Sequence, residues 1–254
     1  MANASTIAGR RVFITGGARG IGAATARAIV ESGGRVALYD LDGEAVSATA
    51  RALGPECAIG LAGDVTDERT VETALGKTVE AFGGLDDLVN NAGTFDHAPL
   101  VELSRARWQR VLDVNLMAPI LISSAAVRVM GRGGSVVNVS SVLGQVAAPG
   151  RGPYCLSKAA LITLTKLQAI EWAERGIRVN AIAPGYILNE ATRAFVEAGG
   201  VDIEAVRRRI PLGCLGEEED VAAGICYLID PVRAKYVTGH VLEVNGGWTA
   251  YGFL

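Results

Sequence analysis

The stretch "RVFITGGARGIG", residues 11–22, decides the fold class. Residues 11–15 are an apolar run typical of a buried strand, and the glycine-rich turn after them opens the helical pattern "IGAATARAIVESGG". Glycine lets the backbone approach a ligand closely, and a helix start offers free N–H groups to a phosphate. A simple turn is the alternative interpretation of the glycines. Strand, glycine-rich turn and helix in this order favour a nucleotide-binding α/β unit.

Outward from this unit, apolar runs rich in β-branched residues alternate with longer helical patterns along the chain. The strands are continuous apolar runs, as expected when both faces of a sheet are covered. The alternation predicts a single α/β domain over residues 1–254, with a doubly wound, mostly parallel sheet and helices on both faces. The predicted strands are 11–15, 35–40, 57–65, 85–93, 134–141, 177–185 and 240–247, and the helices are 21–34, 44–53, 67–82, 104–130, 153–174 and 217–229.

The least regular segment of the chain is 186–216, which follows the sixth predicted strand. In open parallel sheets, ligands bind beyond the carboxyl ends of the strands. We therefore expect residues 186–216 to form a lid over the substrate.

Composition and charge limit the classes of partner. The 254 residues carry a net charge of −3, so we expect no nucleic-acid partner. The N-terminus has no apolar core of signal-peptide length, and no unbroken apolar run approaches the roughly 20 residues of a membrane span. The four cysteines show no metal-binding spacing. We expect a cytoplasmic protein that contacts no membrane, binds no metal and acts on a small-molecule substrate.

Acidic residues after the second and third predicted strands bear on which nucleotide is bound. Asp40 lies 18 residues after Gly22, close to the roughly 20-residue offset of an acid that binds the adenosine ribose. A carboxylate there would repel a 2′-phosphate, so we predict NAD in preference to NADP. Arg19 is the competing signal, because a guanidinium attracts a 2′-phosphate. Asp64 is placed to bond the adenine amino group or, alternatively, to cap a turn, while Asp42 is the better cap for the next helix.

Polar motifs elsewhere in the chain fall at strand ends or helix starts on the same edge of the predicted sheet. They are "NNAG" (90–93), "NVSS" (138–141) and the pair Tyr154 and Lys158, with Asn115 inside an apolar helical pattern. Residues four apart on a helix face the same side, so the Lys158 ammonium lies near the Tyr154 hydroxyl. We expect that cation to lower the pKa of Tyr154 from its ordinary value of about 10. The pair is then suited to move a proton.

Together these motifs resemble the short-chain dehydrogenase/reductase family in its classical branch. The resemblance extends from "RVFITGGARGIG" through "NNAG", "YCLSK" and "VNAIAPG" to "VNGG" near the end of the chain. It implies a Rossmann-like sheet of about seven strands, a nicotinamide cofactor, hydride transfer and a homotetramer.

Carried over position by position, the resemblance assigns roles to individual residues. Ser141 is preferred to Ser140 because it lies 13 residues before Tyr154. Asn189 stands where the family often has a threonine that contacts the nicotinamide amide, and Thr192 is a second candidate. The implied catalytic residues are Asn115, Ser141, Tyr154 and Lys158. The implied cofactor-binding residues are Gly16, Arg19, Gly20, Ile21, Gly22, Asp40, Leu41, Asp64, Val65, Asn91, Ala92, Gly93, Tyr154, Lys158, Pro184, Gly185, Ile187 and Asn189. The implied substrate-binding residues are Ser141, Tyr154, His97 and Tyr186.

Three functions follow from this interpretation. The first is an NAD-dependent dehydrogenase acting on a secondary alcohol, with a sugar, polyol or cyclic alcohol as substrate; the stretches "GTFDHAPLVEL" and "NGGWTAYG" resemble those of bacterial polyol and sugar dehydrogenases. The second is an NADPH-dependent 3-oxoacyl-carrier-protein reductase, against which Asp40 and the net negative charge argue. The third is a non-catalytic nucleotide-binding scaffold, against which the intact catalytic set argues. The identity of the alcohol depends on lid residues and stays open.

Overall fold

The seven strands of the protein form one parallel sheet in the order β3-β2-β1-β4-β5-β6-β7. A computed structural model describes residues 6–197, 199 and 202–251. The predicted parallel, doubly wound sheet is confirmed, and the order reverses between β1 and β4, which is where such sheets bind ligands. The strands are β1 (Arg11–Thr15), β2 (Arg35–Asp40), β3 (Ala58–Ala62), β4 (Leu85–Asn90), β5 (Met130–Val139), β6 (Ile177–Pro184) and β7 (Val241–Val244).

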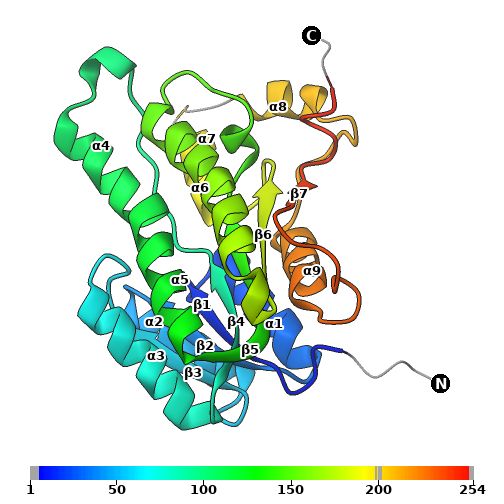
Figure 1. Ribbon diagram of the computed structural model, residues 1–254. Coiled ribbons are helices and arrows are strands. Elements are labelled where there is room, and N and C mark those ends of the chain that lie inside the picture. The colour runs from blue at the N-terminus through cyan, green and yellow to red at the C-terminus, as the bar shows by residue number, and fades with distance from the viewer. Residues whose placement is uncertain (1–5, 198, 200–201, 252–254) are drawn as a thin grey trace.

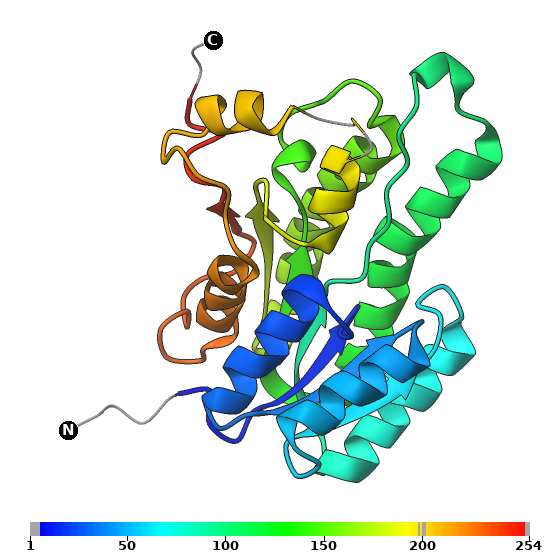
Figure 2. The same cartoon turned by 180° about the vertical axis from the view of Figure 1, so that it is seen from behind.

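Helices cover both faces of the sheet, each over its own apolar core (Figures 1 and 2). One face carries α1 (Gly20–Glu31), α2 (Gly43–Leu53) and α9 (Glu218–Ile229). The other carries α3 (Glu68–Phe82), α5 (Ala118–Val129) and α6 (Gly152–Glu171). The strands are buried from both sides, which explains their continuous apolar sequences.

The helix predicted over 104–130 is interrupted. It consists of α4 (Arg105–Leu112), a π-helical turn η2 (Asp113–Met117) and α5, and Met130 already belongs to β5. Pro119 explains part of the change, because it has no N–H to give the carbonyl four residues earlier, that of Asn115. By length and composition alone, Arg105–Val129 could cross a membrane. Its residues Ala118 and Ile122 are instead buried in the core under the sheet.

A buried polar network lies inside this otherwise apolar layer. Asn90 and Asn138 are register partners at the ends of β4 and β5. The Asn90 amide donates to Asn138 and to Ser123 of α5, and the Asn138 amide donates to Thr165 and Gln168 of α6. The network therefore joins two strands to the two helices that cover them.

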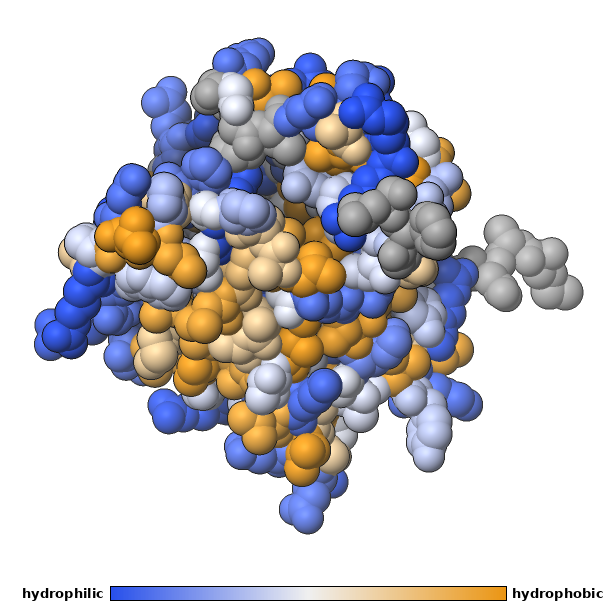
Figure 3. Space-filling view, turned by 90° about the horizontal axis from the view of Figure 1, so that it is seen from above, coloured by the Kyte–Doolittle hydropathy of each residue, from blue (hydrophilic) through white to orange (hydrophobic). Residues whose placement is uncertain are grey.

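The loops at the carboxyl ends of the strands form the upper surface of the molecule. Seen from above, apolar side chains gather in the middle of this surface and hydrophilic ones surround them (Figure 3). The segment predicted as a lid is more regular than expected, because it contains α7 (Glu190–Glu197) and α8 (Ile203–Arg209). Residues 198, 200 and 201 of that segment lie outside the described part of the chain. Shorter helical turns are η1 (Leu100–Glu102), η3 (Val142–Gly144) and η4 (Ala173–Arg175).

Candidate active site

The glycine-rich turn between β1 and α1 has the backbone that its sequence predicts. Gly16 and Gly20 have φ of 65° and 62°, values that favour glycine. Gly22 packs so closely on the turn that a Cβ there would lie 2.1 Å from the Gly16 carbonyl oxygen. The side chain of Asn91, which follows β4, donates to the carbonyls of Thr15 and Gly16 and holds the turn in place.

The first turn of α1 fits a nucleotide phosphate. Arg19 is the N-cap residue but makes no side-chain capping bond, and the first turn contains no acidic residue. The N–H groups of the first turn and the positive end of the helix dipole thus face the glycine turn, with no capping side chain from Arg19. Ile21 of this turn also lines the cavity described below.

Asp40 ends β2 beside this turn. Its carboxylate accepts hydrogen bonds from the backbone N–H groups of Ala18, at 3.0 Å, and Asp42, at 3.1 Å. Arg19 is ion-paired with Asp42, and Asp42 also caps α2 through the N–H of Ala45. Asp42 is therefore the helix cap, as predicted, and it also holds the guanidinium that competes for a 2′-phosphate.

The residues predicted to contact adenine lie further along the same edge. The carboxylate of Asp64 accepts from the N–H and the hydroxyl of Thr66, both at 2.8 Å, which is the turn role left open by the sequence. Leu41 is 74% exposed, and Val65 packs partly on the core. None of these three residues lines the cavity around Tyr154 that is described next.

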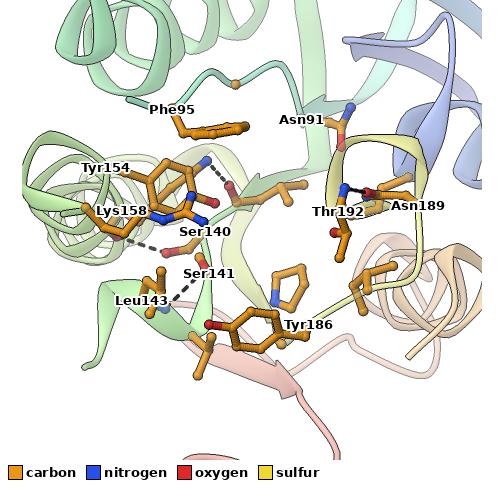
Figure 4. Close-up of a pocket in the computed structure, with 18 of the residues that line it drawn as sticks. Asn91, Phe95, Ser140, Ser141, Leu143, Tyr154, Lys158, Tyr186, Asn189 and Thr192 are labelled. Atoms are coloured by element: carbon orange, nitrogen blue, oxygen red, sulfur yellow. Dashed lines mark hydrogen bonds between the residues drawn. The ribbon is translucent and has the colours of Figure 1, made fainter. Parts of the chain in front are cut away.

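The catalytic set predicted from sequence meets around a cavity of about 310 Å³. Figure 4 shows Tyr154, Lys158 and Ser141 on one side of it, Tyr186 on another, and Asn189 with Thr192 on a third. Pro184, Gly185 and Ile187 from the end of β6, and Asn91 and Gly93 from the end of β4, also line this cavity. Ala92 lies behind it, and its N–H donates to the Thr15 hydroxyl. Residues that are far apart in the sequence thus share one cavity at the switch point of the sheet.

Ser140 and Ser141 have different roles, as the sequence spacing suggested. The Ser140 hydroxyl is buried and donates to the backbone carbonyl of Lys158, so it fastens α6 to the end of β5. The Ser141 hydroxyl accepts from the N–H of Leu143, and Ser141 opposes the rise in the pKa of Tyr154. Ser141 is therefore the serine beside the predicted acid/base.

Tyr154 and Lys158 are neighbours, but their titration differs from the prediction. The Lys158 ammonium lies 5.7 Å from the centre of the Tyr154 ring and donates to the carbonyl of Val139 at 2.7 Å. Burial lowers the pKa of Lys158 from 10.5 to about 8. Burial also raises the pKa of Tyr154, although the hydrogen bond with Ser141 and the charge of Arg151 oppose the rise. The expected lowering of the Tyr154 pKa by Lys158 is wrong for the chain by itself, because desolvation dominates.

Asn115 is fully buried in the π-helical turn η2. Its side-chain oxygen accepts from the N–H of Thr94, and its amide donates to the carbonyl of Thr94 and to the hydroxyl of Ser157. The side chain thus fixes the loop after β4 against α6. Its backbone carbonyl has no α-helical donor, because residue 119 is a proline.

The lid begins with a helix cap. The Asn189 side-chain oxygen accepts from the N–H of Thr192 at 2.8 Å and caps the start of α7. Its amide nitrogen is left to meet a cofactor amide, and both residues line the cavity. An asparagine in the usual threonine place is therefore compatible with cofactor binding and also starts the lid helix.

Some cavity residues were not predicted, and one predicted residue lies elsewhere. His97 is exposed, is not among the lining residues and packs against Gly150. Phe95 and Arg151 do line the cavity, together with Leu143. Spacing could have indicated Arg151, because it lies three residues before Tyr154 on the same helix face. Phe95 gave no such signal, because the loop that carries it has no periodic pattern.

Comparisons with known proteins agree with this geometry. A family model described as "Enoyl-(Acyl carrier protein) reductase" matches residues 16–249. Sorbitol dehydrogenase of Cereibacter sphaeroides is 38% identical, with 94% of this chain and 97% of that protein covered. Cis-4-hydroxycyclohexanecarboxylate dehydrogenase of Sinomonas cyclohexanicum is 41% identical, with 95% and 97% covered. The crystal structure of a short-chain dehydrogenase/reductase from Brucella melitensis, titled a glucose/ribitol dehydrogenase, superimposes with a TM-score of 0.90 at 30% identity, covering 95% of this chain and 97% of that one.

The glycine turn, the strand order and the cluster of Ser141, Tyr154 and Lys158 point in the same direction as these relatives. The protein is an oxidoreductase that uses a nicotinamide cofactor, and the chain belongs to the short-chain dehydrogenase/reductase family.

Proposed function

We propose that the protein interconverts a secondary alcohol and its ketone with NAD(H), and that Tyr154 is the acid/base. The observation that carries the proposal is the Tyr154 side chain, which lines the cavity together with Ser141 and has the Lys158 ammonium 5.7 Å from the centre of its ring. Bound nicotinamide supplies the hydride acceptor in oxidation and the hydride donor in reduction.

The residues of the chain handle the proton and the orientation of the substrate. In oxidation, Tyr154 takes the proton of the substrate hydroxyl; in reduction, it gives a proton to the ketone oxygen. Ser141 donates a hydrogen bond to the same oxygen and fixes its direction. The Lys158 ammonium stabilises negative charge on Tyr154, and the Asn115 carbonyl holds a water that connects Lys158 to solvent.

We propose NAD as the cofactor. The partly exposed Asp40 carboxylate lies beside the glycine turn. There it would accept hydrogen bonds from the hydroxyls of an adenosine ribose, and it would repel a 2′-phosphate. The ion pair between Arg19 and Asp42 supports the same choice, because it occupies the nearest guanidinium.

We propose a sugar, polyol or cyclic alcohol as the substrate, as supported by the printed activities of the relatives. An absorbance screen at alkaline pH would test sorbitol, hydroxylated cyclohexanes, aldoses and hydroxy acids, each with NAD and with NADP. The 3-oxoacyl-carrier-protein reductase is the second candidate, and the description of the matching family model shares with it only the acyl-carrier-protein substrate. Its arm of the screen is the reduction of a 3-oxoacyl thioester by NADPH.

We also propose a single-domain chain that works as a cytoplasmic homotetramer. Support comes from large apolar side chains that α6 leaves exposed, namely Leu156, Leu167 and Ile170, at 54%, 52% and 74%. Exposed apolar side chains on one helix are a common mark of association.

The decisive experiment is Tyr154→Phe. We expect turnover to fall by roughly 10²- to 10⁴-fold, the usual contribution of an acid/base group, while the Kd for NAD measured by calorimetry stays the same. In the wild type, burial of Tyr154 keeps its proton at neutral pH, so oxidation should speed up as the pH rises. Tyr227→Phe, on α9 and away from the cavity, is the matched control. A rate near that of the wild type in Tyr154→Phe would contradict the assignment.

A further inference from the structure

The cavity around Tyr154 is cationic. Two of its lining residues, Lys158 and Arg151, carry positive charge, and no Asp or Glu is among the described residues that line it. Lys158 is engaged by the Val139 carbonyl and lies beside the Tyr154 ring. Arg151 has no place in the proton transfer proposed above, although it lies on the same side of α6.

Arg151 lies close to the reacting hydroxyl. It is the N-cap residue of α6, three positions before Tyr154, so the two side chains leave neighbouring points of one helix face. Its guanidinium stacks over the ring of Phe95, with 5.0 Å between the guanidinium carbon and the ring centre. Burial raises the pKa of both Tyr154 and Tyr186, which lie on two sides of the cavity, and the charge of Arg151 opposes both rises. The positive charge of Arg151 therefore acts on the part of the cavity where a substrate would lie.

The backbone that carries Arg151 is held in place from both sides. A Cβ on Gly150 would lie 2.7 Å from the His97 ring, and a Cβ on Gly152 would lie 2.4 Å from the Leu100 side chain. The Gly150 carbonyl accepts from the N–H of Ala98, and the Arg151 carbonyl accepts from Cys155. Two glycines thus let the loop after β4 pack directly on the start of α6, which fixes Arg151 before any substrate arrives.

The acid nearest to Phe95 in sequence is held by other cations. The carboxylate of Asp96 is ion-paired with Arg107 and Arg110 of α4. A second guanidinium, that of Arg209, stacks on Trp248 at 4.4 Å, and its charge also opposes the rise that burial causes in the pKa of Tyr186. Two positive charges, those of Arg151 and Arg209, therefore lie near Tyr186. The Asp96 carboxylate is paired with α4 instead.

We propose that the substrate alcohol carries a carboxylate, and that Arg151 binds this carboxylate while Tyr154 acts on the hydroxyl. The planar guanidinium fork matches a carboxylate with two parallel hydrogen bonds, and the Phe95 ring keeps the fork in plane. This inference rests on the proposed function and narrows its substrate class to hydroxy acids. The binding part of its test does not need turnover.

The turnover test compares a hydroxycyclohexanecarboxylate with its carboxamide, which has the same ring and hydroxyl but no charge. We expect the wild type to prefer the carboxylate in kcat/KM. Arg151→Gln should lower the ratio of carboxylate to carboxamide by roughly 10- to 100-fold, mainly through KM, as expected for loss of hydrogen bonds to a charged group. Arg151→Lys should recover part of the ratio. Arg69→Gln, which removes an exposed charge on α3, should leave it unchanged.

The binding test uses cyclohexanecarboxylate and cyclohexanecarboxamide, which have no hydroxyl to oxidise, in calorimetry with the NAD complex. We expect the carboxylate to bind more tightly, and Arg151→Gln to remove that difference. If the carboxylate binds through Arg151 but no alcohol is oxidised with NAD or NADP, the proposed function fails and only the assignment of Arg151 as a carboxylate-binding residue stands. If alcohols are oxidised but the ratios in both tests are the same for wild type and Arg151→Gln, the inference is overturned and the proposed function stands.

Discussion

At the scale of the residue, Tyr154 and Lys158 form the pair on which the proposed chemistry depends. The spacing of Tyr154 and Lys158 places both side chains in one cavity, as expected from helix geometry. The spacing could not show that Lys158 donates to Val139, or that burial raises the pKa of Tyr154. Desolvation depends on everything packed around a group, and this information is not local in the sequence.

The cofactor choice is tested at Asp40. We expect Asp40→Ala to lower kcat/KM with NAD by about tenfold and to raise the ratio of NADP to NAD activity, because the change removes a ribose acceptor and a charge that repels phosphate. The control is Glu72→Gln, which removes an exposed carboxylate from α3 and should leave the ratio unchanged. Steady-state kinetics with both nucleotides gives the answer. If Asp40→Ala leaves the ratio of the two kcat/KM values unchanged, Asp40 does not select the cofactor.

At the scale of the element, the positions of strands and helices were predicted better than their interruptions. The helix expected over 104–130 is broken by a π-helical turn, and that turn carries Asn115. Pro119 was visible in the sequence, but prolines are tolerated in the first turn of a helix, so its position alone did not predict the π turn. The loop after β4 was predicted only as a ligand edge, because its shape depends on the ion pairs between Asp96 and α4.

Those ion pairs give this loop a pH dependence. The guanidinium of Arg107 holds the pKa of Asp96 at about 2, below its ordinary value of 3.8. The folded state therefore binds this proton less readily than the unfolded chain, and the stabilisation is present above about pH 4 and lost as the pH falls toward 2. We expect Asp96→Asn to lower the Tm at pH 6 and to resemble the wild type increasingly below pH 4.

Thermal unfolding followed by circular dichroism between pH 2.5 and 7 measures this gap in Tm. The control is Glu80→Gln, an exposed change on α3 that should give no gap at any pH. A gap between Asp96→Asn and the wild type that stays constant across the range would show that the carboxylate charge is not what matters.

At the scale of the whole molecule, the two edges of the sheet have different tasks. The carboxyl edge carries the cavity, and the amino edge carries ion pairs between β1 and β4, among them Arg10 with the buried Asp87. The doubly wound, mostly parallel sheet was predicted from the alternation of strands and helices, but the order of its strands was not. The pairing of Arg10 with Asp87 could not be predicted, because a charged residue in a strand, such as Asp87, is normally expected to be exposed.

The amino-edge pair predicts a strong dependence of stability on both partners. Burial raises the pKa of Asp87 to about 6, and Arg10 opposes the rise. We expect Arg10→Met to lower the free energy of unfolding by about 3–5 kcal/mol, because it leaves a buried carboxylate without its counter-charge. The double variant Arg10→Met/Asp87→Leu should recover most of the loss in urea unfolding. If the double variant is less stable than Arg10→Met alone, the two residues do not act as a pair.

The asparagine network between β4 and β5 affects which alignment of these strands the folded chain adopts. A shift of β5 by one residue would turn Asn138 to the opposite face, and the buried side chains of Asn90, Thr165 and Gln168 would each lose a hydrogen bond. Misaligned strands made only of valine and isoleucine would cost far less, since one apolar side chain replaces another. The network therefore penalises wrong alignments more than it stabilises the right one. Residues directly beneath the active site thus ensure that Asn91 and Ser141, which follow these strands, arrive at the cavity in the correct positions.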